Sequence, residues 1–357
     1  MDPKHLVPEL NIVVSNSCNF NCENCNRMSN YNFTGHYNWE QSKDELAKWA
    51  ERIDTHKWTL IGGEPTITPS FRQWLRGVHT LWPNAEGILL TNGSLLKTDD
   101  EELYTILQQS NGKVTIEVGL HNSNRRQEML DFTFAFLKGN IYAYNYNDYV
   151  STFLDSYKLI RANEWPECNS VEDWDSLPDE IKTECEQVYN FNPELLRKEQ
   201  IETLVDKEVM MFEDSNGVKI AIHVANHFFK SAAIPDVATQ TFTLHNSDPV
   251  VAHKLCAERR GNVGQITAKN MYKCSTIQML PEFDKQFTIN MSDADRELLH
   301  SYKPATNDMT DEELQQWILD SQGPIPQCKF CTDDYSLSEI FAEPKKVFFV
   351  KKPKSKQ

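Results

Sequence analysis

Four short runs of apolar, often β-branched residues stand out in the first third of the chain. Such runs are typical of strands buried in a sheet, and they predict strands at residues 10–15, 58–61, 87–91 and 113–121. Apolar residues recur at helical spacing over residues 39–53, and a second helix is expected near 69–81. A capping box, Thr98-x-x-Glu101, predicts the start of a third helix. Strands that alternate with helices predict a parallel sheet or barrel with right-handed crossovers.

Two of the predicted strands alternate apolar and polar side chains. Residues 113–121 place Glu117, Gly119 and His121 on the face opposite the apolar residues, and residues 218–224 (VKIAIHV) place His223 in the same way. If the apolar faces pack on outer helices, Glu117, His121 and His223 point inward. His121 and His223 are therefore candidate catalytic residues, with a hydrogen-bonded structural histidine as the alternative for His121. Lys230 follows at the end of the strand where barrel sites are built and is a third candidate, or part of a solvated basic loop.

The pattern loosens in the middle of the chain and at its end. Residues 122–217 read as a helical and aromatic insertion whose aromatic run either lines a substrate pocket or packs in the core. Cys168 and Cys185 lie here without a partner cysteine nearby in sequence, which favours inert thiols. Residues 336–357 are basic, and we expect an exposed tail with one docked strand at 347–350. A partner-binding role for this tail is the alternative.

Composition and charge narrow the function classes. The 357 residues carry 39% hydrophobic and 25% charged residues, which is globular composition. The net charge of -16 disfavours long nucleic acid, whose binding rests on cationic phosphate contacts, but it allows a nucleotide-sized substrate. No apolar run approaches the roughly 20 residues that span a bilayer, and the start lacks the apolar core of a secretory signal. We therefore expect a cytoplasmic protein without membrane contact, whose cysteines stay reduced.

The nine cysteines fall into groups. The first group, Cys18-x3-Cys22-x2-Cys25, lies in one loop after the first predicted strand. Three thiolates can hold three irons of a [4Fe–4S] cluster and leave the fourth iron open to bind a small molecule. A structural zinc site is the alternative, but zinc takes four ligands and this loop offers three cysteines.

A second motif, Gly62-Gly63-Glu64-Pro65, follows the second predicted strand, where paired glycines let the backbone approach a ligand closely. The two motifs together, in this order and about forty residues apart, resemble the radical S-adenosylmethionine (SAM) enzymes. The resemblance implies an α/β fold with a partial (β/α)6 barrel, a [4Fe–4S] cluster on Cys18, Cys22 and Cys25, and SAM chelated at the open iron. It also implies that a donor such as flavodoxin or ferredoxin supplies one electron, which cleaves SAM to a 5'-deoxyadenosyl radical that abstracts a substrate hydrogen.

The same resemblance implies which residues meet SAM. Gly62, Gly63 and Glu64 would contact the methionine amino group, and the backbone at Asn24 would meet adenine. The position of Asn24 is often aromatic in the family, so the usual apolar shelf is missing here. Gly119 stands where a serine near the ribose is usual, and we expect Asn92 and His121 to replace it.

The later cysteines form a second group, Cys256-x17-Cys274 followed by Cys328-x2-Cys331. Four thiolates can close a tetrahedral zinc site or ligate all four irons of a [4Fe–4S] cluster. In a radical SAM context the spacing resembles the twitch domain, a shortened SPASM domain, which implies one fully ligated auxiliary cluster that transfers electrons. We expect residues 1–245 to form the barrel, 246–335 the twitch domain and 336–357 the tail.

Among twitch relatives the pattern is most similar to aminocyclitol dehydrogenases. This resemblance implies oxidation of a hydroxyl-bearing carbon in a small sugar, cyclitol or nucleoside-like substrate, with the auxiliary cluster taking the second electron. Modification of a peptide or protein is the alternative, although the cluster loop begins at residue 18 and leaves no room before it for a peptide-recognition domain. Epimerisation would need a thiol donor such as Cys168 or Cys185. The non-enzyme alternative is a zinc-binding module.

Overall fold

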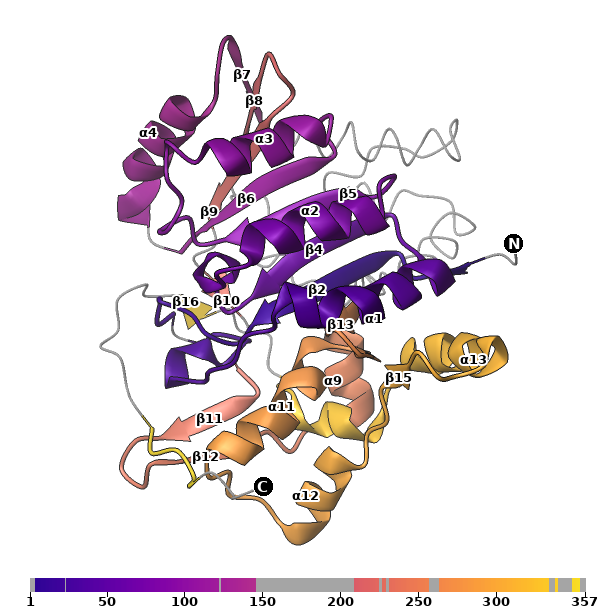
Figure 1. Cartoon of the computed structure of the whole chain (residues 1–357). Coiled ribbons are helices and arrows are strands. Elements are labelled where there is room, and N and C mark those ends of the chain that lie inside the picture. The colour runs from indigo at the N-terminus through magenta and orange to yellow at the C-terminus, as the bar shows by residue number, and fades with distance from the viewer. Residues whose placement is uncertain are drawn as a thin grey trace, which may run out of the picture.

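The computed structural model describes residues 4–22, 24–121, 123–145, 209–224, 227–228, 231–256, 263–333, 338–339 and 349–353. Its centre is a ten-stranded sheet in the order β15-β14-β13-β2-β4-β5-β6-β9-β8-β7 (Figure 1). The strands from β13 to β9 in this order run parallel, and the strands on both flanks are antiparallel. The α/β class with a central parallel sheet, expected from a partial barrel, is confirmed.

The strands of this sheet are β2 Glu9–Ser15, β4 Lys57–Gly62, β5 Glu86–Thr91, β6 Val114–Leu120, β7 Ile141–Asn145, β8 Val209–Asp214, β9 Lys219–Val224, β13 Val263–Ile266, β14 Asn270–Tyr272 and β15 Ala305–Thr306. The remaining described strands form pairs, which are β1 His5–Leu6 with β3 Ile53–Asp54, β10 His227–Phe228 with β16 Ser338–Glu339, and β11 Ala233–Asp236 with β12 Thr241–Leu244.

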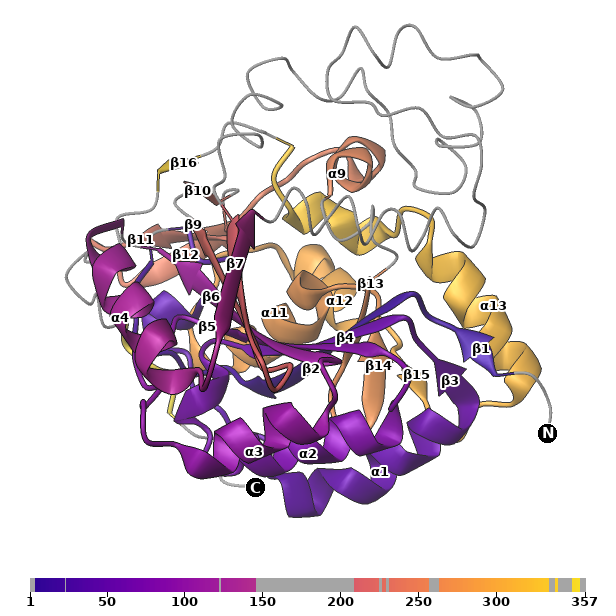
Figure 2. The same cartoon turned by 90° about the horizontal axis from the view of Figure 1, so that it is seen from above.

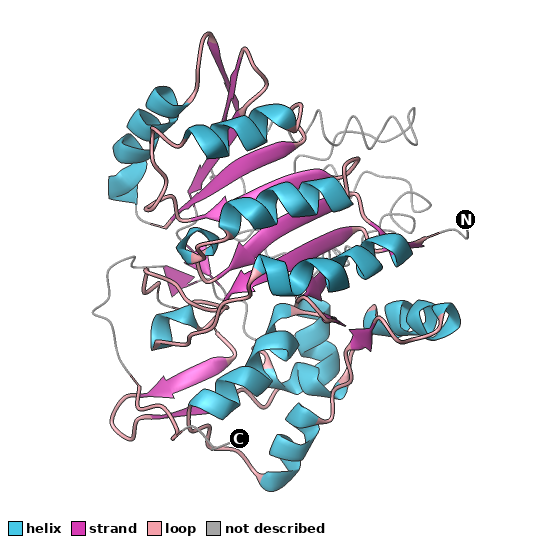
Figure 3. Ribbon diagram, viewed as in Figure 1, coloured by secondary structure: helices cyan, strands magenta, loops and turns pink. Residues whose placement is uncertain are grey.

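Helices alternate with the strands in the first part of the chain and cluster in the last part (Figure 3). The described α-helices are α1 Trp39–Arg52, α2 Phe71–Leu81, α3 Glu101–Gln109, α4 Arg126–Phe136, α9 Pro249–Leu255, α11 Ser275–Gln286, α12 Asp293–His300 and α13 Asp311–Ser321. The short 3-10 helices are η1 Ser29–Tyr31, η2 Pro65–Ile67, η3 Ser123–Arg125 and η5 Pro326–Phe330.

Helices α1, α2 and α3 lie side by side over one face of the sheet (Figures 1 and 2). The main core forms between them and the strands, where alternate side chains of each strand are buried. On β6 these are Val114, Ile116, Val118 and Leu120. The prediction that the apolar residues of this strand face the helices is therefore confirmed, and Glu117 stands half-buried on the opposite, inner face.

The C-terminal hairpin extends the same sheet. Strands β13 and β14 pair antiparallel, and β13 also pairs in parallel with β2, with Gln265 opposite Asn11. This second pairing is a long-range contact that local pattern does not predict. Our expected boundary between residues 245 and 246 stays a prediction.

The start of α3 differs from the expectation. Asp100, not Thr98, is the N-cap, and its carboxylate accepts a hydrogen bond from the Leu103 N–H at 3.0 Å. A carboxylate is at least as good a cap as a threonine hydroxyl, and Asp100 also binds the Arg72 guanidinium. The predicted capping box at Thr98 is therefore wrong, and the helix is capped by Asp100 two residues later.

Several predictions concern residues outside the described ranges. These are the aromatic run beyond residue 145, Cys168, Cys185 and Lys230. Within the described part of the chain, no helix is both long and apolar enough to cross a membrane.

A second core lies between the loop after the first cysteines and the C-terminal helices. Phe242, Phe283 and Phe287 form its centre, and Tyr31 packs edge-on against Phe242 with ring centroids 5.1 Å apart. Phe349, from the C-terminal tail, is buried in the same cluster. The tail thus docks as expected, although residues 349–353 form no strand.

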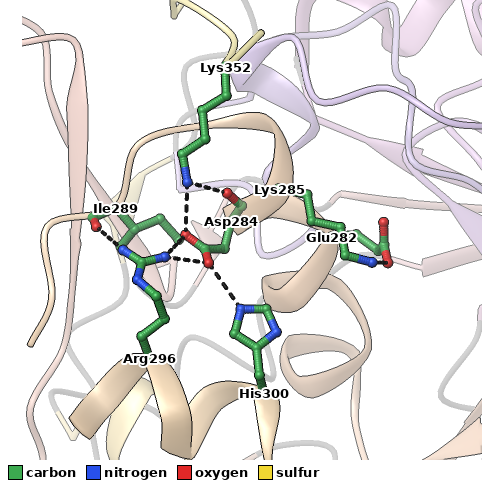
Figure 4. Close-up of polar contacts among 7 residues, drawn as sticks. All are labelled: Glu282, Asp284, Lys285, Ile289, Arg296, His300 and Lys352. Carbon is green, nitrogen blue, oxygen red and sulfur yellow. Dashed lines mark hydrogen bonds and ion pairs between the residues drawn. The ribbon is translucent and has the colours of Figure 1, made fainter. Parts of the chain in front are cut away.

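The tail is also tied down by charge. Asp284 on α11 is 6% exposed and binds Arg296 and His300 of α12 together with Lys352 of the tail (Figure 4). The Asn32 side chain bonds both the N–H and the carbonyl of Phe349, at 3.1 and 3.3 Å. The end of the chain therefore packs on the loop that follows the first cysteine group.

Candidate functional site

The first cysteine group lies in the loop that leaves the carboxyl end of β2. Burial raises the pKa of the Cys18 thiol to about 12, against hydrogen bonds donated by the Phe20 N–H and by Asn92. The pKa of Cys22 is also raised by burial, and the charges of Cys25 and Cys18 raise it further. The three cysteines therefore lie within electrostatic range of one another.

The chemistry of these three cysteines suits binding of an iron–sulfur cluster. All three thiols are free and at least half-buried, so their thiolates need a metal to compensate the lost hydration. Within the described residues, no group of three or more His, Cys, Asp or Glu side chains closes on a common point as a metal site. A cluster bound by Cys18, Cys22 and Cys25 would therefore draw the thiols together and release their protons.

Gly62 and Gly63 hold this loop against the end of β4. The Gly63 N–H donates to the Ser15 carbonyl at 2.8 Å, and the Glu64 N–H donates to the Ser17 carbonyl at 2.8 Å. A Cβ at Gly62 would lie 2.3 Å from the Ser15 oxygen, and one at Gly63 would lie 2.3 Å from the Ser17 oxygen. Both glycines are thus required by the close approach of the cysteine loop itself.

Glu64 joins the ends of β4 and β5. Its side chain is 1% exposed, and Oε1 accepts hydrogen bonds from the Thr91 hydroxyl at 2.7 Å and from the Thr66 hydroxyl at 2.6 Å. Oε2 accepts the Asn92 N–H at 2.8 Å. Burial raises the pKa of Glu64, but hydrogen bonds from Asn92, Thr66 and Thr91 stabilise the carboxylate against that effect.

Asn92 connects this network to the cysteine loop. Its amide nitrogen donates to Asn19 Oδ1 at 3.0 Å and lies 3.9 Å from Cys18 Sγ. Of the residues predicted to bind SAM, Gly62, Gly63, Glu64 and Asn92 therefore converge on one loop. Asn24 lies in that loop in the left-handed conformation, with φ of 56°, which Asn tolerates better than most residues.

The inner face of the sheet carries a second polar group further along. Glu117 Oε1 lies 3.2 Å from His223 Nδ1, and both side chains are partly exposed. The register pairs Gly119 with His223, and a Cβ added at Gly119 would meet the His121 ring at 3.4 Å and the His223 ring at 3.9 Å. The two histidines predicted to point inward therefore flank the same glycine.

This polar group and the cysteine loop lie along one edge of the sheet. Leu90 pairs with Glu117, so Asn92 continues the row of Gly119 and His223. Neighbouring strands lie about 4.8 Å apart, which puts β5 and β9 about 10 Å apart across β6. Lys230 lies outside the described residues and is not placed beside them.

The C-terminal cysteines come from three elements, α9, α11 and η5. Cys256 ends α9, Cys274 is the N-cap of α11, and Cys328 and Cys331 lie in and directly after η5. Helix α9 packs on η5, and the preceding Ser247 hydroxyl donates to the Cys331 carbonyl at 2.8 Å.

Tyr302 lies near two of these cysteines, Cys274 and Cys328. Burial raises the pKa of its hydroxyl, and the charges of Cys274 and Cys328 add to that effect. Burial also raises the pKa of Cys328, while the nearby charge of Lys273 lowers it. Four cysteine ligands suit either a closed iron–sulfur cluster or zinc.

Sequence reasoning missed several residues that support the site. Thr66 and Thr91 bind Glu64, and Arg27 donates from Nη1 to Gln265 Oε1 at 3.1 Å in a buried contact. Thr91 ends a predicted strand next to Asn92, which was a usable signal. The contact of Arg27 with Gln265 bridges 238 residues of sequence and left no local signal.

Comparison with known proteins identifies the class. Residues 12–171 match the family model of the Radical SAM superfamily. This part of the chain is a radical SAM domain, and it contains the first cysteine loop, the Gly62-Gly63-Glu64 motif and strands β4 to β6. Members of this superfamily use a [4Fe–4S] cluster and SAM, and the matched residues contain the cysteines and the motif that we expect to bind them.

Solved structures show weak likeness. Streptococcus suis SuiB bound to S-adenosylmethionine is 14% identical over 89% of this chain and 64% of its own, with a TM-score of 0.37. BtrN in complex with AdoMet and 2-DOIA is 16% identical over 36% of this chain and 52% of its own, with a TM-score of 0.26. Histidine-tagged anSMEcpe with bound AdoMet is 14% identical over 36% of this chain and 40% of its own, with a TM-score of 0.29.

The matched region thus covers 52% of the BtrN chain and 40% of the anSMEcpe chain. Likeness at these scores carries no argument about function. No curated protein matches the chain significantly.

Proposed function

We propose that this radical SAM enzyme oxidises a hydroxyl-bearing carbon of a small sugar, cyclitol or nucleoside-like molecule. The observation that carries the proposal is the pair of Glu117 and His223 on the inner face of the sheet, in the same row as Asn92. Oxidation of an alcohol after hydrogen abstraction requires a proton acceptor, and a histidine oriented by a carboxylate is a suitable one.

Cys18, Cys22 and Cys25 would hold the cluster. SAM would meet the backbone of Gly62 and Gly63 together with Glu64, its adenine would meet the backbone at Asn24, and Asn92 and His121 would contact its ribose. The chemistry that a bound cluster and SAM supply is abstraction of a substrate hydrogen atom by a 5'-deoxyadenosyl radical.

His223 then takes the hydroxyl proton at Nε2, while Glu117 holds Nδ1 at 3.2 Å. The carbon radical left by hydrogen abstraction loses one electron as the carbonyl forms. Cys256, Cys274, Cys328 and Cys331 would hold a second [4Fe–4S] cluster, which would supply an acceptor for this electron. One hydrogen atom, one proton and one electron thereby leave the substrate, which balances oxidation of an alcohol to a ketone.

The proposal includes a setting for the enzyme. A flavodoxin or ferredoxin supplies the priming electron, and the cytoplasm keeps the cysteines reduced. His121 and Lys230 are the other proposed catalytic residues. Either one would be the proton acceptor if His223 proves dispensable.

The test is a panel of cyclitols, monosaccharides and nucleosides incubated with the anaerobically reconstituted enzyme, dithionite and SAM. 5'-Deoxyadenosine and carbonyl product are measured separately. We expect His223→Gln to keep 5'-deoxyadenosine formation and to lower ketone formation about 100-fold or more. Lys219→Gln, at the far end of β9, is the control and leaves both unchanged.

Two results would count against the proposal. Hydrogen exchange without carbonyl formation would indicate epimerisation, and ketone formation at the wild-type rate by His223→Gln would remove His223 from the reaction.

A further inference from the structure

Arg27 is a buried cation directly after the first cysteine group. Its side chain is 6% exposed. The Met28 N–H donates to the Cys25 carbonyl at 2.9 Å, which closes a tight turn over residues 25–28 with Arg27 inside it. The turn keeps Arg27 next to the last cysteine of the loop.

The guanidinium reaches from this turn to the C-terminal part of the chain. Arg27 Nη1 donates to Gln265 Oε1 at 3.1 Å, and Gln265 is 0% exposed. Gln265 lies on β13, which is fixed by parallel pairing to β2 and leads through β14 toward Cys274. One end of Arg27 is therefore set by the cysteine loop and the other by a strand that the sheet holds rigidly.

A charge in this place acts strongly on the loop. Arginine stays protonated at every physiological pH, and charge–charge energies grow as the local dielectric falls with burial. Any negative charge added to this loop is therefore stabilised by Arg27.

We propose that Arg27, held in place by Gln265, is a positioning residue that raises the reduction potential of the cluster on Cys18, Cys22 and Cys25. Reduction of a [4Fe–4S] cluster adds one negative charge, and a fixed buried cation favours the reduced state. The inference rests on the proposed cluster site, and it holds for any substrate of the enzyme.

The test is a redox titration of the reconstituted full-length protein followed by electron paramagnetic resonance. The first cluster is recognised because its spectrum changes when SAM is added. We expect Arg27→Gln to lower the ratio of reduced to oxidised cluster at least tenfold at a fixed potential, which is about 59 mV for a one-electron couple. Arg27→Lys keeps the charge and shifts the ratio less than about threefold.

Two further variants keep the test decisive. Arg76→Gln removes an exposed arginine on α2 and is expected to match wild type. Gln265→Leu leaves the charge of Arg27 in place but removes its hydrogen bond to β13. We expect its ratio of reduced to oxidised cluster to lie between those of wild type and Arg27→Gln. This variant becomes the test if Arg27→Gln assembles no cluster.

The inference would be overturned if Arg27→Gln had the wild-type ratio of reduced to oxidised cluster. If Arg27→Gln assembles no cluster, a wild-type ratio in Gln265→Leu would overturn it. A wild-type protein without any reducible cluster would overturn the proposed function as well, and it would be seen before any variant is compared.

Discussion

The backbone N–H of Asn92 donates a hydrogen bond of 2.8 Å to the carboxylate of Glu64. This bond ties the loop after β5 to the motif after β4, and Asn92 in turn contacts Cys18 and Asn19. Glu64 therefore acts on the cysteine loop through Asn92 even before any cofactor is bound.

Replacement of Glu64 by glutamine is expected to damage this network although it keeps the shape of the side chain. Both carboxylate oxygens accept from donors only, namely Thr66, Thr91 and Asn92. The amide NH₂ of Gln must then face a donor, which costs about 1–3 kcal/mol of the free energy of unfolding. Denaturant unfolding of the protein without cofactors measures this cost, and equal stability of Glu64→Gln and wild type would contradict it.

A methyl group at Gly63 should separate the cysteine loop from β4. The added Cβ of Gly63→Ala would lie 2.3 Å from the Ser17 carbonyl oxygen, and backbone cannot move aside as a side chain can. We expect a loss of about 1–3 kcal/mol in stability and a lower iron content after reconstitution. Gly323→Ala is the matched control because its Cβ meets nothing closer than 3.8 Å, and a similar loss in both variants would refute the argument.

The strands and helices of the first third of the chain could be predicted because each carries its own period. The row of Glu117, Gly119 and His121 followed from alternation along one strand, and His223 from alternation along another. The contact between Glu117 and His223 could not be predicted in this way. It depends on the register of β6 against β9, and alternation within each strand does not determine that register.

Other features depended on contacts between distant segments. The parallel pairing of β13 with β2 and the contact of Arg27 with Gln265 join the two ends of the chain. The Asp284 cluster likewise joins α11, α12 and the tail. Local propensity does not predict contacts between distant segments. The sequence analysis therefore treated residues 246–335 as a separate domain.

The Asp284 cluster should make stability depend on acid pH. Burial raises the pKa of Asp284, but hydrogen bonds from Arg296 and His300 and the charge of Lys352 outweigh it, so the native pKa is lowered. The stabilisation is therefore present above the unfolded pKa of about 3.9 and is lost as pH falls through the native pKa. Thermal unfolding between about pH 6 and 3 should show a steeper loss for wild type than for Asp284→Asn.

At neutral pH we expect Asp284→Asn to cost about 2 kcal/mol, since it removes charge-assisted hydrogen bonds to cations. Asp44→Asn, at an exposed position on α1, is the control and should follow wild type. Parallel pH profiles for wild type and Asp284→Asn would show that the cluster contributes nothing to stability at acid pH.

The C-terminal cysteines should account for half of the iron. If they ligate a second [4Fe–4S] cluster, wild type holds about eight irons and Cys328→Ser about four. Cys168→Ser, which removes a cysteine outside both groups, should keep about eight. About four irons and one zinc in wild type would instead show that the second site is structural, and an electron acceptor other than that site would be required.

The central claim is that the loop of Cys18, Cys22 and Cys25 generates radical chemistry from SAM. The most direct measurement is 5'-deoxyadenosine formed by the anaerobically reconstituted protein with dithionite and SAM, beside a variant with all three cysteines changed to alanine. We predict formation by wild type and none by the triple variant, which keeps all four C-terminal cysteines. An iron-loaded wild-type protein that leaves SAM intact, or a triple variant that cleaves SAM as wild type does, would contradict the account.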